Sequence, residues 1–461
     1  MNIKKYVGDK EFYKMVLLIA IPIMIQNGIT NFVSMLDNIM VGQIGTDAMS
    51  GVAISNQFIF IFNIFIFGAI SGPGIFSAQF YGNDDHEGVR QTFRFKLILC
   101  GIITAIGMFV IGIFRQELIS LFLHEGSTSG NIAETLRYGS GYIAIDIIGL
   151  IPFAVTQSYS STLRETGETI LPMKAGITAV CINIVFNYLF IFGKMGLPVM
   201  GAYGAALATV ISRFVECFIV VMWTHRHKEK NKFIVGAYKN FKIEKNLAKH
   251  IILRGTPLVM NEGLWAMGMS TLNSIYSHGG LAIVAAINIS STISNVFNIV
   301  YIALGSSISI IVGQLLGAGK MEEAKDTDTK LIAFAVVSCV VFGSILALVS
   351  QFFPRIYNTT EEVRYYASYF ILIVALCMPL EAFMNAAYFT LRSGGKTFIT
   401  FLFDSVSIWA ISIPFAYILM TFTSMNIILI YLCCQLISII KCIIGYVLVK
   451  RGVWINNIVI K

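Results

Sequence analysis

AIPIMIQNGITNFVSMLDNIMVGQIG, residues 20–45, is a long apolar segment that contains one proline, Pro22, and one carboxylate, Asp37. A segment of about 20 apolar residues can cross a bilayer as a helix. A carboxylate inside such a helix costs at least about 2.5 kcal/mol and is rarely present without a function. Proline frees a backbone carbonyl and bends the helix. The segment therefore predicts a membrane helix with a hinge at Pro22 and a functional Asp37. The alternative is that Asp37 is solvated at the outer end of the helix.

The composition of the whole chain fits many such helices. Of its 461 residues, 56% are hydrophobic and 13% are charged. Soluble domains carry about 25% charged residues, so the sequence predicts an all-α polytopic membrane protein. Apolar runs between polar breaks predict twelve transmembrane helices. We expect them near residues 15–43, 49–79, 93–114, 138–163, 170–192, 201–224, 251–277, 281–315, 331–353, 365–391, 397–421 and 425–449.

The basic residues collect in alternate connections between these helices. Of the 33 lysines and arginines, 26 fall in the two termini and every second loop, and only five fall in the remaining loops. The positive-inside rule therefore places both termini and the long central loop in the cytoplasm, with the protein in the cell (inner or plasma) membrane. We interpret the net charge of +8 as a consequence of this topology and not as a sign of nucleic-acid binding.

The two halves of the sequence are related by an internal repeat. Pro22 corresponds to Pro257 at an offset of 235, and at the same offset Gly82 corresponds to Gly317. An offset that stays constant through two helices indicates duplication of the first part of the chain. Pro257 is therefore a second predicted hinge.

This duplication predicts the domain organisation. We expect an N-lobe over residues 1–223, a cytoplasmic linker over 224–250 and a C-lobe over 251–461. Each lobe would be a six-helix bundle, and a pseudo-twofold axis along the membrane normal would relate the two. Transporters built in this way bind their substrate at the interface of the repeats and rock one half against the other.

The residues that we single out inside the predicted helices are ionisable: Asp37, Asp146, Arg213, Glu216, Glu262, Glu381 and Asp404. The repeat does not duplicate the charges of Asp37, Glu262 and Glu381, which correspond to Leu272, Asn27 and Phe153. Arg213 and Glu216 are three residues apart, so we expect them to neutralise each other. Asp146 is expected to be solvated at the outer end of its helix, and Asp404 is ambiguous. No histidine falls inside a predicted helix, so carboxylates would carry any coupling ion.

Two asparagines near the end of the fifth predicted helix share one helix face. Asn183 and Asn187 are four residues apart, so their amide oxygens can face the same cation. The following segment contains the run GAALAT at residues 204–209, whose small residues allow helices to approach closely. The alternative is that the asparagines only join two helices through hydrogen bonds.

These features together resemble the multidrug and toxic compound extrusion (MATE) family over nearly the whole chain. The residues that carry the resemblance are Pro22, the run DNIMVG at 37–42, and the run NYLFIFGKMGLP at 187–198 followed by GAALAT. The resemblance implies an antiporter that exports amphipathic cationic drugs and dyes in exchange for Na⁺ or H⁺. It implies a membrane transporter that is not an enzyme, needs no cofactor, contacts membrane lipid and acts as a monomer.

The resemblance also implies two groups of site residues. Asp37, Asn183, Asn187 and Thr209 match a cation site of the family's N-lobe. Glu262 and Glu381 match carboxylates of the C-lobe in a bacterial branch that resembles sodium-coupled exporters. Either group is therefore expected to hold Na⁺ or a proton.

Three other functions are weighed against drug export. A lipid-linked oligosaccharide flippase of a related fold would need several buried basic residues for pyrophosphate, whereas the buried charges here are mainly acidic. A membrane-embedded enzyme would need a nucleophile set or metal-ligand spacing, and neither is evident. A channel fits the unequal carboxylates of the two halves less well than alternating access does.

Overall fold

The computed structural model describes residues 5–122 and 131–459, without the side chains of residues 33–35 and 38. Over these ranges the chain is helical, and no β-strand occurs in them. Eleven of the described helices are long and apolar enough to cross a membrane. The twelfth, α8 (Lys245–Ser277), occupies the position predicted for the seventh span and carries Arg254 and Glu262. The predicted all-α, polytopic fold is confirmed.

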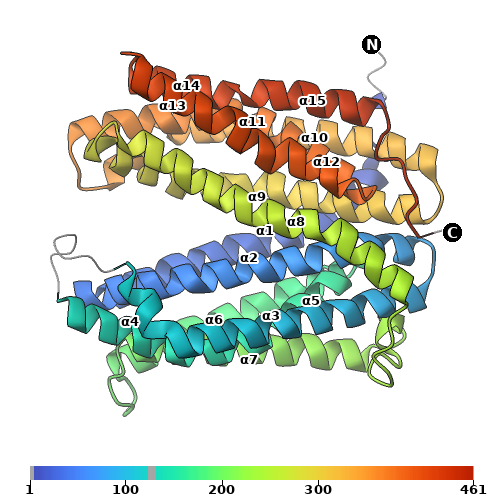
Figure 1. Ribbon diagram of the computed structural model, residues 1–461, viewed down its shortest axis with the longest axis horizontal. Helices are drawn as coiled ribbons and strands as arrows, with labels where there is room; N and C mark the ends of the chain where they lie inside the picture. The colour runs from blue at the N-terminus through green and yellow to red at the C-terminus, as the bar shows by residue number, and fades with distance from the viewer. Residues whose placement is uncertain (1–4, 123–130, 460–461) are drawn as a thin grey trace. The chain divides into compact units, whose positions relative to one another are not determined.

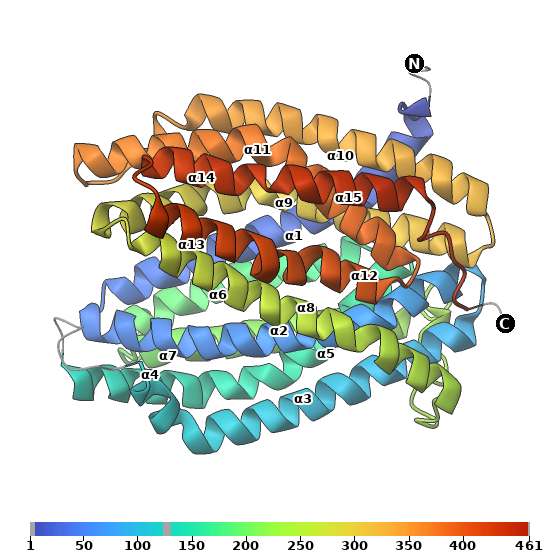
Figure 2. The same ribbon diagram turned by 45° about the horizontal axis from the view of Figure 1, so that its top comes forward.

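The helix bounds follow the predicted spans closely (Figures 1 and 2). The first half contains α1 (Lys10–Gly42), α2 (Thr46–Gly82), α3 (His86–Ser120), α4 (Ile132–Asp146), α5 (Leu150–Glu165), α6 (Ile170–Phe192) and α7 (Ala202–Arg226). The second half contains α8, α9 (Leu281–Gly317), α10 (Met321–Val349), α11 (Glu361–Ser393), α12 (Thr397–Phe401), α13 (Ile413–Phe422), α14 (Ile427–Leu436) and α15 (Ser438–Lys450).

Three predicted spans are interrupted helices. A 3-10 turn, Ile147–Gly149, joins α4 to α5. Two π-helical stretches, Leu402–Val406 and Ile408–Ser412, join α12 to α13. The third break lies at Ile437, between α14 and α15. π-Helical turns are rare and often lie at functional sites, which draws attention to Asp404 inside the first π-helical stretch.

The described chain packs into two compact units. The N-unit comprises Ile25–Ser77 and His86–Lys249, and the C-unit comprises Met1–Met24, Ala78–Asp85 and His250–Lys461. The chain thus passes from the C-unit to the N-unit inside α1, two residues after Pro22. It returns briefly to the C-unit at the end of α2. The predicted division into two lobes with a linker over 224–250 stays a prediction.

In the C-unit, the two repeat-related segments cross each other at their glycines. A Cβ atom on Gly82 would meet the carbonyl of Gln314, and a Cβ on Gly317 would meet the carbonyl of Gln79. Gln79 corresponds to Gln314 at the same offset of 235 that relates the two glycines. The ends of α2 and α9 therefore touch backbone to backbone, and only glycine fits at either crossing position.

The C-terminal segment fastens this crossing. The buried Gln79 side chain donates to the carbonyls of Ser393 at 2.9 Å and Asn456 at 3.2 Å, and it accepts from the Ile458 amide at 2.8 Å. Asn457 donates to the carbonyl of Leu316 at the end of α9, at 2.8 Å. The last turn of α2 is therefore held by backbone groups of α11 and of the chain's final described residues.

In the N-unit, α6 and α7 pack closely because of their small residues. A Cβ on Gly204 would lie 2.8 Å from the backbone of Phe190. Ala205 and Ala206 are fully or almost fully buried beside Val41 and Ile191. This close approach brings α1, α6 and α7 together, and these are the three helices that carry Asp37, the two asparagines and Thr209.

Candidate functional site

The four residues predicted for the N-lobe site form one hydrogen-bonded cluster in the N-unit. The Asn187 amide nitrogen donates to the Asp37 carboxylate and, at 3.1 Å, to Oδ1 of Asn183. The Asn183 amide nitrogen in turn donates to Oγ1 of Thr209 at 3.3 Å. Residues from α1, α6 and α7 thus lie in one connected chain, although 172 positions separate Asp37 from Thr209.

The helical spacing of the asparagines explains why they can link two other helices. Asn183 and Asn187 lie one turn apart on α6, so both side chains leave the same face. Asn187 is fully buried and Asn183 is 3% exposed. Oδ1 of Asn187 is buried and has no hydrogen-bond partner among the described residues. Because hard cations are bound by carboxylate and amide oxygens, this free acceptor beside a carboxylate fits a small cation or an added proton.

The charged residues beside this cluster pair differently from the prediction. Arg213 forms an ion pair with Asp146, with nitrogen–oxygen distances of 3.2 and 3.3 Å. Asp146 is 1% exposed, so its predicted solvation at a helix end is wrong. Arg213 therefore forms its ion pair with Asp146, while Glu216 lies within electrostatic range of Arg213. Sequence spacing could not show this ion pair, because its two residues lie 67 positions apart on different helices.

A second polar cluster lies in the C-unit and contains Glu262 and Glu381. Oγ of Ser438, at the start of α15, donates to Oε1 of Glu381 at 2.9 Å. Glu262 on α8 lies within electrostatic range of Arg392 and Asp404. Asp404 is also within range of Glu381. The two predicted carboxylates therefore belong to one charged neighbourhood, with Asp404 as their common neighbour.

Asp404 is an integral member of this C-unit cluster, which the sequence left ambiguous. Asn261 donates to Oδ2 of Asp404 at 2.9 Å, and Nζ of Lys441 lies 3.9 Å from Oδ1. Oγ of Ser405 donates to Oδ1 of Asn261 at 2.7 Å, which fixes the π-helical stretch against α8. The buried Tyr388 side chain lies within electrostatic range of Glu262 and Asp404, and its hydroxyl interacts with Arg392. The cluster thus contains three carboxylates whose charge can meet a cation.

Both predicted hinges lie inside long helices. Pro22 is in α1 and Pro257 is in α8. Proline at such positions removes a backbone hydrogen bond and allows a bend. Further prolines lie inside α2, at Pro73, and inside α11, at Pro379. That either predicted proline acts as a hinge stays a prediction.

Three buried charged residues outside these clusters, Lys96, Glu165 and Asp328, were not singled out from the sequence. Nζ of Lys96 on α3 contacts the Glu165 carboxylate on α5 and lies 3.1 Å from both Ser161 Oγ and Thr162 Oγ1. In the C-unit, Thr390 donates to the buried Asp328 at 2.6 Å. The Lys96 side chain is completely buried.

A protein-family model described as MatE matches residues 22–189 and 257–418 of this chain. Two curated relatives are a "Probable multidrug resistance protein NorM" of Thermotoga maritima and a "Probable multidrug resistance protein YoeA" of Bacillus subtilis. The first is 24% identical over 89% of this chain and 86% of its own length. The second is 24% identical over 89% of this chain and 87% of its own length.

Solved structures share the fold over almost the full chain. An outward-facing conformation of a multidrug resistance MATE family transporter matches with a TM-score of 0.85 at 18% identity, over 97% of this chain and 98% of its own. Crystal structures of MATE in a bent and in a straight conformation each match with a TM-score of 0.84. The bent structure is 17% identical, over 97% of each chain, and the straight one is 18% identical, over 98% of each chain.

Proposed function

The chain belongs to the MatE family of multidrug efflux transporters, and from this premise we propose that it exports amphipathic organic cations in exchange for Na⁺ or H⁺. The family model covers well over half of the chain, and the relatives carry the name of multidrug resistance proteins. The protein is a multi-pass membrane transporter and not an enzyme. The coupling ion, the class of drug and the orientation in the membrane are the proposed parts.

The single observation that best supports ion coupling is the cluster around Asp37. A carboxylate, two amide side chains and a hydroxyl meet there within the N-unit, and one buried amide oxygen has no partner among the described residues. Na⁺ would be held by the oxygens of Asp37, Asn183, Asn187 and Thr209. A proton would instead bind the carboxylate itself. Both ions neutralise the same charge, and that neutralisation is the step the exchange requires.

The C-unit cluster supports a second place where charge is neutralised. Glu262 and Glu381 share the neighbourhood of Asp404, and Lys441 and Arg392 offset part of the charge of the three carboxylates. A lipophilic cation can replace Na⁺ or H⁺ as the counter-charge at such a site. Because one carboxylate charge needs one counter-charge, drug and coupling ion compete, which is the basis of exchange.

Helix α1 offers a physical connection between the ion and the conformation. Asp37 lies fifteen residues after Pro22 on one helix, about 22 Å along the axis at the ordinary rise per residue. Pro22 lies two residues before the chain passes from the C-unit to the N-unit. Binding of an ion at Asp37 would favour one conformation of α1, bent or straight at Pro22, over the other. A ligand shifts such an equilibrium only by its difference in affinity for the two states.

The proposed orientation follows the distribution of basic residues. Both termini and the linker over 224–250 lie in the cytoplasm in this proposal, because 26 of the 33 lysines and arginines belong to that side. The drug would then be taken from the cytoplasm and released outside. For each net positive charge carried inward, the membrane potential contributes about 2.3 kcal/mol per 100 mV.

The test is ethidium efflux from cells that express Asp37→Asn, Glu262→Gln or Glu381→Gln at equal levels. We expect each variant to lose most of the efflux. Asp328→Asn is the matched control, because it neutralises a buried carboxylate outside both clusters and its amide oxygen still accepts from Thr390. Unchanged efflux in all three test variants would contradict the proposal.

A further inference from the structure

The strongest charge concentration in the chain is the linker over residues 224–250, which the transport cycle above does not use. It contains eight lysines and arginines against two glutamates, a net charge of +6 out of +8 for the whole chain. We propose that this linker is a binding surface for the anionic phospholipid headgroups of the adjoining leaflet. The inference rests on the cytoplasmic orientation proposed above.

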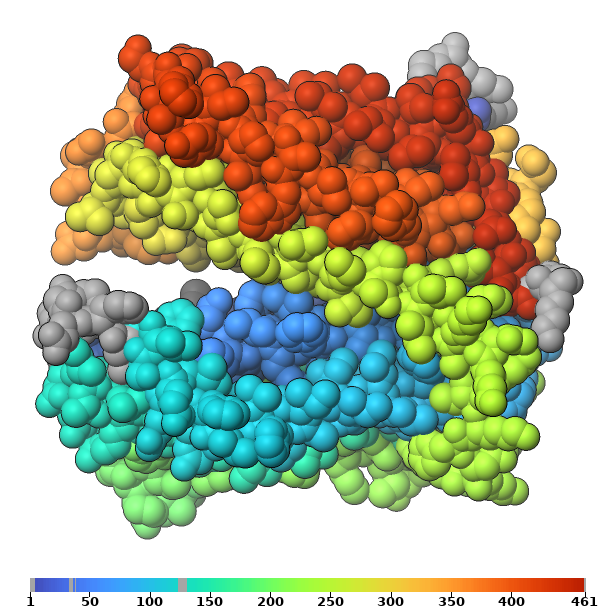
Figure 3. Space-filling view, in the orientation of Figure 1, coloured from blue at the N-terminus to red at the C-terminus, as the bar shows by residue number. Residues whose placement is uncertain are grey.

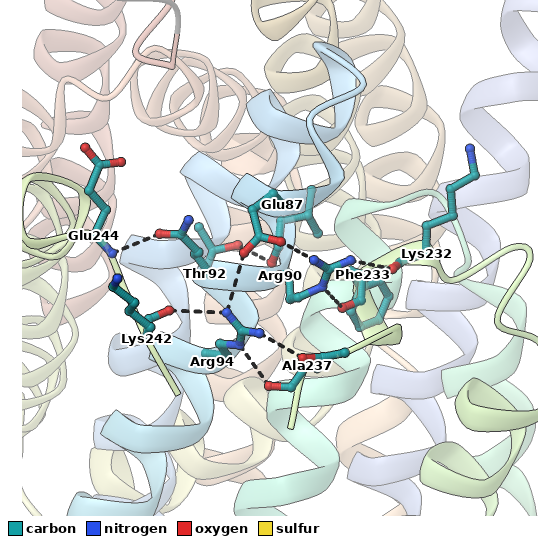
Figure 4. A network of polar contacts seen from close by, with 12 residues as sticks. Glu87, Arg90, Thr92, Arg94, Lys232, Phe233, Ala237, Lys242 and Glu244 are labelled. Carbon is teal, nitrogen blue, oxygen red and sulfur yellow. Dashed lines mark hydrogen bonds and ion pairs between the residues drawn. The ribbon is translucent and has the colours of Figure 1, made fainter. Parts of the chain in front are cut away.

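Two arginines of α3 hold the linker in a fixed conformation (Figure 4). Arg94 donates to the carbonyls of Ala237 and Gly236, each at 2.8 Å, and to that of Lys242 at 3.2 Å. Arg90 donates to the carbonyl of Phe233 at 3.2 Å. Glu87 forms ion pairs with both arginines and so orients them. The linker is therefore an ordered part of the N-unit.

Buried apolar side chains fix the same segment. Phe233 is 2% exposed, and its ring centroid lies 5.3 Å from that of Phe93 on α3. Ile234 and Ala237 are also buried. In Figure 3 the linker, in lime green at the lower right, lies at one end of the N-unit. An ordered linker loses less conformational entropy when it binds a partner than a disordered linker does.

The contacts of Arg90 and Arg94 leave the positive charges of the linker available. Both arginines bind main-chain carbonyls of the linker, so the lysine ammonium groups take no part in the contacts of Figure 4. The Lys232 side chain points away from the arginines in that view. Among the described residues, no ion pair involves a linker lysine. The exposed lysines are Lys228, Lys230, Lys232, Lys239, Lys242, Lys245 and Lys249.

Exposed apolar side chains between these lysines favour a bilayer as the partner. Val235 is 49% exposed, Tyr238 47% and Phe241 53%, and all three lie between Lys232 and Lys242. Aromatic residues beside lysines are typical of segments at the headgroup level of a membrane. The linker also includes the last residues of α7 and the first residues of α8. A polybasic segment next to a membrane helix attracts anionic lipids, whereas a soluble acidic partner would not need the exposed aromatic rings.

Native mass spectrometry of the full chain in detergent tests this binding without any ion gradient, so its failure is separate from a failure of the transport proposal. The probes are phosphatidylglycerol and phosphatidylcholine. The test variant is Lys230→Gln/Lys239→Gln/Lys242→Gln. The control, Lys320→Gln/Lys325→Gln/Lys330→Gln, removes the same charge from the turn and helix after α9 on the same predicted side.

We expect phosphatidylglycerol to bind at least about tenfold more tightly than phosphatidylcholine, and the linker variant to lose at least about tenfold of that affinity. The control should lose less than about twofold, and added salt should weaken only the binding of phosphatidylglycerol. Equal affinity for the two lipids would overturn the proposal, as would an equal loss in the control. If poly-aspartate competes with bound phosphatidylglycerol as strongly as free phosphatidylglycerol does, that result would point to a soluble acidic partner and would also overturn the proposal.

Discussion

The buried pair of Lys96 and Glu165 allows a sharp prediction about what holds the N-unit together. The Lys96 side chain is 0% exposed and that of Glu165 is 11% exposed. Ser161 Oγ joins the two, because it lies 3.1 Å from Nζ of Lys96 and donates to Oε1 of Glu165 at 2.6 Å. The perturbations are Lys96→Met, Glu165→Gln and the double variant, which keep the side chains close to their original size.

The expected magnitudes follow from this burial. Removing one partner of a buried pair leaves an uncompensated charge and costs about 3–5 kcal/mol. Replacing both partners removes the two desolvation penalties together and is often close to neutral. We therefore expect the double variant to be more stable than Lys96→Met alone. The coupling free energy between the two sites should reach at least about 2 kcal/mol.

The assay is the apparent melting temperature of the detergent-solubilised chain. It is measured as the fraction of protein that stays monodisperse after heating. Lys330→Met is the control. It breaks an ion pair with Asp326 between partly exposed side chains, separated by 2.6 Å, which is worth about 0–1 kcal/mol. If the shifts of the two single variants simply add in the double variant, the pair is not coupled and the reasoning is refuted.

Three further predictions concern the crossing and the ion site. Gly317→Val places a side chain against the carbonyl of Gln79 and should lower the melting temperature strongly, whereas Gly101→Val has open space and should not; equal shifts would contradict the backbone crossing. Gln79→Ala removes one buried and two partly buried hydrogen bonds and should cost about 2–4 kcal/mol in thermal unfolding. An unchanged melting temperature would mean that these bonds to the C-terminal segment do not stabilise the C-unit. Asn187→Leu should raise the ion concentration for half-maximal efflux at least about fivefold, because it removes an oxygen ligand and the donor to Asp37. Asn187→Asp should keep the ion dependence. If Asn187→Leu leaves the half-maximal ion concentration unchanged, the Asn187 side chain is not part of the ion site.

The fold was largely predictable because membrane helices leave a strong local signal. Apolar runs located all twelve spans, and the predicted fifth span, 170–192, coincides with α6. A bilayer forces such runs to be helical, so length and hydropathy suffice. The equivalence of Gly82 and Gly317 was also visible as an offset in the sequence. Their direct contact was not, because an offset does not say which equivalent residues meet.

The clustering of the four N-unit residues was predictable only because they resemble a family motif. Spacing alone showed that Asn183 and Asn187 share a face, but not that Asp37 and Thr209 lie beside them. The pairs Lys96–Glu165 and Asp146–Arg213 were missed for the same reason. Their members lie 69 and 67 positions apart, on different helices, and no local pattern relates them. Partners of this kind are fixed by tertiary packing.

The central claim is that neutralisation of Asp37 by Na⁺ or H⁺ drives export. The most direct measurement is ethidium transport in proteoliposomes under an imposed sodium gradient or an imposed pH gradient, for the unaltered chain and for Asp37→Asn. The account predicts that one of the two gradients drives transport by the unaltered chain, and that Asp37→Asn loses this response. Transport that ignores both gradients, or an Asp37→Asn variant that responds to them as the unaltered chain does, would contradict the account.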